Sequence, residues 1–154
     1  TPMMVQLMIM YFVIFSSSRH EVAVATLAFG INSGAYVAEI VRGGIMSVDA
    51  GQMEAGRSLG MNYTQTMRHI IIPQAIKNIL PALGNEMITL LKDTSLMTVI
   101  GAKDLTKAAQ TVQAVTYQAF MPYISIAVIY LVCVIALSKL LALIERRMRN
   151  SDRR

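Results

Sequence analysis

Long apolar segments alternate with polar ones along this chain, and their lengths predict membrane-spanning helices. We expect four spans, at residues 3–15, 22–41, 79–100 and 123–144. A helix needs roughly 20 apolar residues to cross a bilayer core, so the first segment is short for a full crossing. The pattern predicts an all-α integral membrane protein, a multi-span helical bundle in one domain, 1–154.

The polar interruption between the second and third spans, residues 42–78, has a helical pattern of its own. Asp49, or Ser47 before it, can cap a short helix, and Gly60 can end that helix in a left-handed conformation. Helical spacing resumes after Gly60 and should stop at Pro73. The result is a helix, a glycine turn and a second helix, which could also be an ordinary amphipathic connector.

Composition supports the membrane class. The 154 residues are 55% hydrophobic and only 15% charged, and the mean hydropathy is +0.51. A soluble domain of this size needs more polar surface. The single cysteine, Cys133, lies in an apolar run, which excludes a disulfide framework and a cysteine metal site.

The basic residues predict which side of the membrane each loop faces. The segment after Ile144, ERRMRNSDRR, has five arginines and two acidic residues. The 42–78 loop has four basic and two acidic residues, whereas residues 101–122 have two lysines and one aspartate. Positive charge favours the cytoplasmic side, so the 42–78 loop and the C-terminus should be cytoplasmic, and residues 16–21 and 101–122 outside. The alternative reading of the basic tail is nucleic-acid binding.

Enzyme motifs and metal clusters are missing from the sequence. His20 and His69 lie far apart in different loops, and neither Cys133 nor any serine has a base beside it. The sequence predicts no catalytic residue and no metal site.

The 42–78 loop resembles the EAA signature of permease subunits in bacterial ABC importers. That signature is E-A-A, three residues, Gly, nine residues and I-x-L-P. The matching positions here are Glu54, Ala55, Gly56, Gly60, Ile70, Ile72 and Pro73. Gly56 replaces the second Ala and Ile72 replaces Leu, and both keep small or apolar character.

Flanking segments narrow the resemblance to the polar amino acid importers of the histidine, glutamine and arginine kind. The similar segments are Thr1-Pro2 with Val5-Gln6, residues 32–40, residues 42–45, residues 84–86 and residues 91–96. Members of that family have one more membrane helix upstream, so we expect the N-terminus of this sequence to be incomplete.

The resemblance implies a type I importer architecture and a set of partners. These are two cytoplasmic ATPase subunits, which bind the ATP and magnesium, a second permease copy or a paralogue, an extracytoplasmic amino-acid-binding protein and the amino acid itself. It also implies a multi-pass protein of the bacterial cell membrane, with no cofactor in this chain. The helix around Glu54 to Gly60 would be the element that couples to the ATPase, and Gly60→Asp should uncouple transport.

Polar residues within the spans are candidates for the substrate path. Asn32 and Glu39 share a helical face, with Tyr36 between them. Glu39 should face the bundle interior because a lipid-facing carboxylate is costly, unless it pairs with Arg42. The next span adds further candidates for holding an amino acid, namely Asn85, Glu86 and Thr89.

Lys92 and Asp93 follow in the same span, and for them we favour a structural ion pair or a gating role.

A rival function uses the same features. A membrane adaptor or assembly subunit would dock a cytoplasmic partner without conducting solute, and it would lack polar residues that converge within the membrane.

Overall fold

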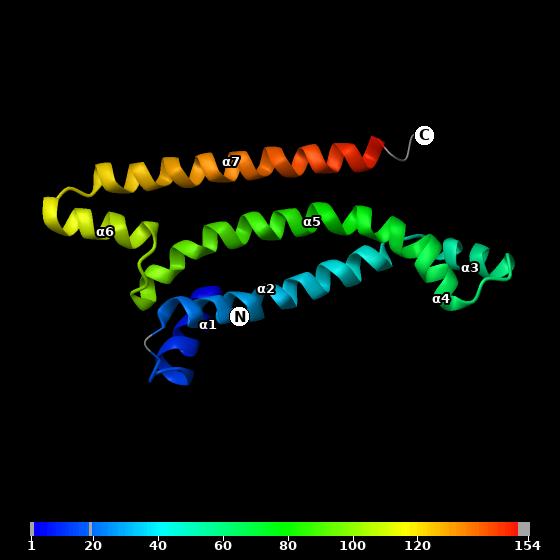
Figure 1. Ribbon diagram of the computed structural model, residues 1–154, viewed down its shortest axis with the longest axis horizontal. Coiled ribbons are helices and arrows are strands. Elements are labelled where there is room, and N and C mark those ends of the chain that lie inside the picture. The colour runs from blue at the N-terminus through cyan, green and yellow to red at the C-terminus, as the bar shows by residue number, and fades with distance from the viewer. Residues whose placement is uncertain (1, 19, 151–154) are drawn as a thin grey trace. The chain divides into compact units, whose positions relative to one another are not determined.

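The computed structural model describes residues 2–18 and 20–150, with side chains through residue 146. Throughout the described part, all regular secondary structure is helical, as the sequence predicts (Figure 1). Thr1 of the predicted entry motif, and the basic tail's side chains from Arg147 onward, lie outside the described residues.

Ten helical segments follow one another in these residues. They are α1 (Met3–Ile9), the π-helix η1 (Met10–Ile14), α2 (Glu21–Met46), α3 (Ala50–Ser58), α4 (Tyr63–Thr66), the π-helix η2 (Met67–Ile71), α5 (Ile72–Asp93), the 3₁₀-helix η3 (Thr94–Ile100), α6 (Leu105–Thr116) and α7 (Phe120–Asn150).

Two helices in the described chain are long and apolar enough to cross a bilayer, Glu21–Met46 and Phe120–Arg146. They correspond to the predicted spans 22–41 and 123–144. The first predicted span, 3–15, forms the shorter apolar helix Met3–Ile14. The third, 79–100, covers most of α5 and all of η3, so its helix begins earlier than the hydropathy pattern suggests.

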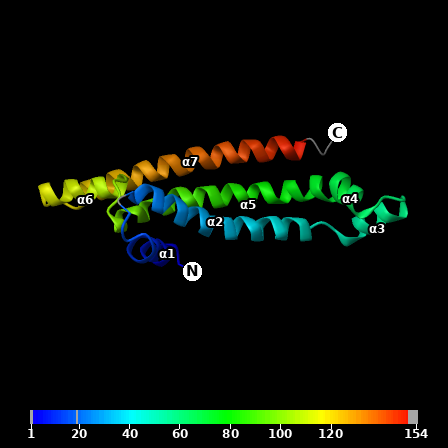
Figure 2. The same ribbon diagram turned by 60° about the horizontal axis from the view of Figure 1, so that its bottom comes forward.

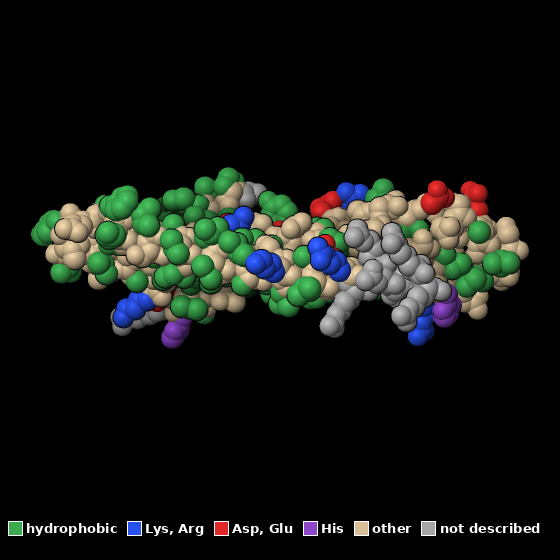
Figure 3. All heavy atoms as spheres, turned by 90° about the horizontal axis from the view of Figure 1, so that it is seen from above, with side chains coloured by type: hydrophobic (Ala, Val, Ile, Leu, Met, Phe, Trp, Pro, Cys, Tyr) green, Lys and Arg blue, Asp and Glu red, His purple; other side chains and the backbone are tan. Residues whose placement is uncertain are grey.

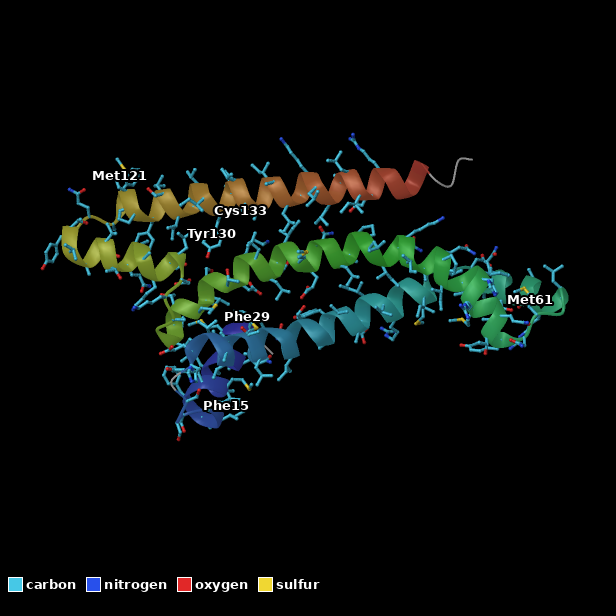
Figure 4. All side chains as sticks on the ribbon, viewed as in Figure 1. Phe15, Phe29, Met61, Met121, Tyr130 and Cys133 are labelled. Carbon is cyan, nitrogen blue, oxygen red and sulfur yellow. The ribbon has the colours of Figure 1, made fainter. Side chains whose placement is uncertain are left out.

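The chain divides into two compact units. The first combines the residues up to Gly34 with Met87–Ser138, and the second combines Ala35–Glu86 with the segment from Lys139 onward. In the first unit, α1, η1, the first half of α2 and η3 enclose a small apolar core. Its buried members are Leu7, Met10, Val24, Ala25, Ala28, Ile100 and Ala102, and Phe15 and Phe29 (Figure 4) pack against it.

In the second unit, glycines allow helices to approach closely. A Cβ atom on Gly44 of α2 would lie 2.2 Å from Cγ1 of Ile79 on α5, and one on Gly84 of α5 would lie 2.9 Å from a methyl of Leu141 on α7. These contacts leave no room for a side chain at either glycine. The pairs α2–α5 and α5–α7 are therefore packed at short range where they meet in this unit.

Pro73 does not end a helix, which corrects the sequence-based expectation. Helical backbone continues from α4 through η2 into α5, with Pro73 as the second residue of α5. A proline ring crowds the carbonyl four residues before it, and the wider π-turn of η2 immediately upstream accommodates that ring. Pro81 lies inside α5 and Pro122 in the first turn of α7, so neither ends a helix.

Hydrophobic side chains occupy much of the visible surface, whereas charged side chains are few (Figure 3). On α7, Leu131 and Val132 expose 57% and 60% of their area. Cys133 is also exposed (Figure 4). This surface suits lipid or another apolar helix better than water.

Candidate docking surface and substrate-path residues

The 42–78 loop folds into two short helices joined by a tight turn, and we call α3, α4 and the residues between them the docking knob (residues 50–66). α3 and α4 lie beside each other in both ribbon views (Figures 1 and 2). Asp49 caps α3, because its carboxylate accepts a hydrogen bond of 2.6 Å from the backbone N–H of Gly51. Of the two predicted caps, Asp49 is thus the one used. Ser47 instead accepts a bond of 2.8 Å from the side chain of Asn78 on α5.

The turn of the knob closes on Gly60, as predicted. Gly60 has φ +80°, in the left-handed region that glycine adopts without steric cost. The backbone N–H of Met61 donates to the carbonyl of Gly56 at 3.1 Å, and that of Gly60 donates to the carbonyl of Arg57 at 2.9 Å. This pair of bonds is a Schellman motif, which satisfies the last carbonyls of α3. Met61 marks the turn in Figure 4.

α4 begins with a capping box immediately after this turn. The side chain of Asn62 accepts from the backbone N–H of Gln65 at 2.9 Å, and the side chain of Gln65 accepts from the backbone N–H of Asn62 at 2.9 Å. Two otherwise unsatisfied helix donors are thereby paired. The exit of α3 and the entry of α4 are both fixed by local hydrogen bonds, so the knob is a rigid element.

Gly56 lies where the two helices touch. Thr66 is fully buried, and a Cβ atom on Gly56 would lie 2.5 Å from its methyl and 2.8 Å from its hydroxyl oxygen. Contact at this distance is not possible without displacement. The departure from the E-A-A pattern at this position therefore has a structural reason, which the sequence did not reveal because it depends on the Thr66 side chain.

Two apolar side chains of the knob, next to its turn, are exposed. Leu59 and Tyr63 expose 79% and 60% of their area, and Glu54 and Ala55 are exposed beside them. In the following helices Ile71 is buried and Ile70 half-buried, while Pro73 is exposed. Of the predicted motif residues, Gly56 is buried and Ile70 half-buried, and the others are exposed, namely Glu54, Ala55, Gly60, Ile72 and Pro73.

A cavity of about 800 Å³ borders the knob within the second unit. It is lined by the α2–α3 connection, the first turns of α5 and the last described turns of α7. Lys77 and Arg146 contribute positive charge there, and Asp49 and Glu145 contribute negative charge. The cavity is therefore polar and electrically balanced.

Among the candidates for a substrate path, Glu39 pairs with Arg42, which is the alternative that the sequence analysis left open. Its carboxylate accepts from Nε of Arg42 at 3.0 Å and forms an ion pair with Nη2 of the same side chain. Both side chains are more than half exposed. Tyr36 exposes 54% of its area one turn before.

Asn32 is engaged with α1. Its amide donates to Oε1 of Gln6 at 2.9 Å, and Nε2 of Gln6 in turn donates to the carbonyl of Ala28 at 3.3 Å. Gln6 is a residue that the sequence analysis did not single out for this role, since only its place within an apolar helix marked it. A substrate contact of Asn32 stays a prediction.

The remaining candidates lie along α5 and are divided between the two units. Asn85 and Glu86 belong to the second unit, and Thr89, Lys92 and Asp93 to the first. The structure shows no ion pair between Lys92 and Asp93. Lys92 lines a cavity of about 380 Å³ in the first unit, together with Ser95, Thr106, Tyr123, Ile126, Ala127 and Tyr130. The convergence of all these residues on one path stays a prediction.

Comparisons with known proteins agree on one family. The family model of the binding-protein-dependent transport system inner membrane component matches residues 1–150. The glutamine transport system permease protein GlnP of Escherichia coli strain K12 is 41% identical over 153 residues, which cover 97% of this chain and 70% of that protein. The arginine transport system permease protein ArtQ of Bacillus subtilis is 40% identical over 155 residues, covering 99% and 71%.

A solved structure is also similar. A chain in the crystal structure of an amino acid ABC transporter with histidines superposes with a TM-score of 0.89 at 54% sequence identity. The match covers 96% of this chain and 70% of that one.

Proposed function

The chain belongs to the family of binding-protein-dependent transport system inner membrane components, and from this premise we propose that it forms part of the pathway of an ATP-driven amino acid importer and couples that pathway to cytoplasmic ATPase subunits. The observation that carries the proposal is the docking knob. The backbone N–H groups of its turn are hydrogen-bonded, and it exposes Leu59 and Tyr63 to the surroundings.

A rigid knob suits a coupling role for a mechanical reason. Two ATPase subunits that close on ATP would move two such knobs together, and a stiff helix pair transmits a displacement to the spans instead of absorbing it. ATP and magnesium would bind to the ATPase chains, since this sequence has no glycine-rich phosphate loop. The knob and the C-terminus would then face the cytoplasm of a bacterial cell.

The transported solute is an amino acid in this proposal. Support comes from the named relatives, which are glutamine and arginine transport permeases, and from the polar residues of α2 and α5. An extracytoplasmic binding protein would deliver the solute, and a second copy of this chain or a paralogue would complete the pathway. Uptake of a panel of labelled amino acids by vesicles that contain the reconstituted transporter would identify the substrate.

Neutral substitutions in the predicted path distinguish a permease from an adaptor. We expect Glu86→Gln and Asn32→Ala to change the apparent affinity or the rate of uptake, because each removes a group that the solute would contact in a poorly hydrated site. The measurement is initial uptake at several substrate concentrations, with ATP hydrolysis followed in parallel. If both variants transport with unaltered affinity and rate, these residues are not in the path and the adaptor function gains support.

A further inference from the structure

Where α6 turns into α7, the chain presents apolar side chains to its surroundings. We call residues 112–125 the α6–α7 corner. Val115, Tyr117, Phe120 and Met121 expose 76%, 92%, 72% and 65% of their area, and Met121 marks the corner in Figure 4. An exposed apolar surface of this kind indicates contact with lipid or protein instead of water.

Charged residues are missing from the corner and from the sequence on both sides of it. Between Lys107 and Lys139 the sequence has no Asp, Glu, Lys or Arg. This uncharged stretch runs without interruption from α6 through the corner into the candidate membrane helix Phe120–Arg146. The corner is therefore continuous in composition with a segment that suits a bilayer.

Three hydroxyls at or next to the corner donate within the chain. The hydroxyls of Thr111, Thr116 and Ser125 donate to the carbonyls of Lys107, Val112 and Met121, at 2.9, 2.9 and 2.8 Å. Each acceptor lies four residues earlier on the same segment. Because these hydroxyls donate within their own helix, none of them needs a hydrogen bond to the solvent. A hydrocarbon environment requires such internal pairing, whereas water does not.

A fourth hydroxyl ties the two helices together. The hydroxyl of Tyr123 on α7 donates to Oε1 of Gln113 on α6 at 2.7 Å. Below this bond, Leu105 and Val112 of α6 and Ile126 of α7 line a mainly apolar cavity of about 370 Å³. The bond therefore links α6 to α7 within the corner.

The length of α7 sets the depth of the corner. Residues 120–144 contain one charged side chain, Lys139, near their end. At 1.5 Å per residue they rise about 37 Å, compared with about 30 Å for a bilayer core. A helix centred on that core therefore has about 3.5 Å at each end, less than one turn, in the headgroup layer. Tyrosine at that level is typical of membrane interfaces.

From these observations we propose that the α6–α7 corner is inserted into the interfacial layer of the phospholipid bilayer, with Tyr117 and Phe120 among the lipids. The occupant is lipid and not a protein partner. A protein that docked here would meet no charged group and few polar groups free for a directed contact, whereas a bilayer needs neither.

Fluorescence quenching tests the proposal, because this sequence contains no tryptophan. Tyr117→Trp is the first variant, since an aromatic ring replaces another at the same backbone conformation. Phe120→Trp is the second and lies in the regular first turn of α7. The complete transporter would be reconstituted in phosphatidylcholine vesicles, with and without bromine on the acyl chains, and the signal of the unsubstituted complex subtracted.

We expect bromine near the headgroup to remove most of the added fluorescence of both variants, and aqueous iodide to remove little. Val132→Trp, in the middle of α7, should be quenched best by bromine near the chain ends. Tyr63→Trp, on the docking knob, should resist lipid bromine. Quenching by iodide alone would place the corner in water and overturn the proposal. Resistance to both quenchers, or protection that appears only with an added binding protein, would indicate a protein cover and would overturn it too.

Discussion

At the scale of single residues, two glycines shape the docking knob for different reasons. Gly60 is favoured by its backbone, because φ +80° is costly for most residues with a Cβ atom, Asn and Asp being the main exceptions. Gly56 is required by its neighbour, because Thr66 occupies the space of a side chain there. The sequence predicted the role of Gly60 from its place after a helical segment. It could not predict that of Gly56, since a contact between two helices depends on how they cross.

We expect Gly56→Ala to destabilise the knob by about 1–3 kcal/mol, the usual cost of inserting a methyl group into a filled contact. The readout is the thermal inactivation midpoint of the purified transporter. Thr66→Ala is the matched partner variant, because it removes the two atoms nearest to the added methyl. The double variant should lose less stability than the sum of the losses in the two single variants. Strict additivity would mean that the Gly56–Thr66 contact does not limit this position.

At the scale of secondary-structure elements, the helices of the spans were predictable and their ends were less so. Hydropathy located α2 and α7 because both are continuously apolar over the length of a bilayer. The sequence-based prediction failed at Pro73, because proline usually stops a helix and the residue pattern does not reveal the π-turn before it. The sequence also missed the partner of Asn32, since nothing in the spacing relates Gln6 on α1 to a position on α2.

The α1–α2 hydrogen bond supplies a control for the role of Asn32. Asn32→Ala breaks the bond of 2.9 Å to Gln6, and Gln6→Ala breaks that bond together with its own bond to the carbonyl of Ala28. A purely structural role therefore predicts a loss of stability of about 0.5–1.5 kcal/mol for each bond removed, with the larger loss in Gln6→Ala. A substrate contact predicts that Asn32→Ala alone also raises the substrate concentration for half-maximal uptake. Kinetics and thermal inactivation measured on the same two preparations separate the outcomes, and equal uptake kinetics would contradict a role in binding.

At the scale of the whole molecule, the sequence predicted the structural class and the protein family more firmly than the substrate path. The all-α membrane class follows from composition and hydropathy, and the family follows from motifs spread over nearly the whole chain. The substrate path stays a prediction, and its candidate residues are divided between two compact units. Side-chain spacing along one helix cannot show whether these residues converge.

The central claim is that the docking knob couples an external ATPase to amino acid movement through this chain. The most direct measurement compares Gly60→Asp with Gly60→Asn in reconstituted vesicles, where uptake and ATP hydrolysis are recorded together. Asp and Asn both tolerate a left-handed backbone, a Cβ atom at position 60 meets nothing within 4 Å, and the two variants differ mainly in charge. We predict that Gly60→Asp abolishes uptake and the accompanying stimulation of ATP hydrolysis. Gly60→Asn should keep most of the uptake and most of the stimulation. Full uptake with normal ATP hydrolysis in Gly60→Asp would contradict the account.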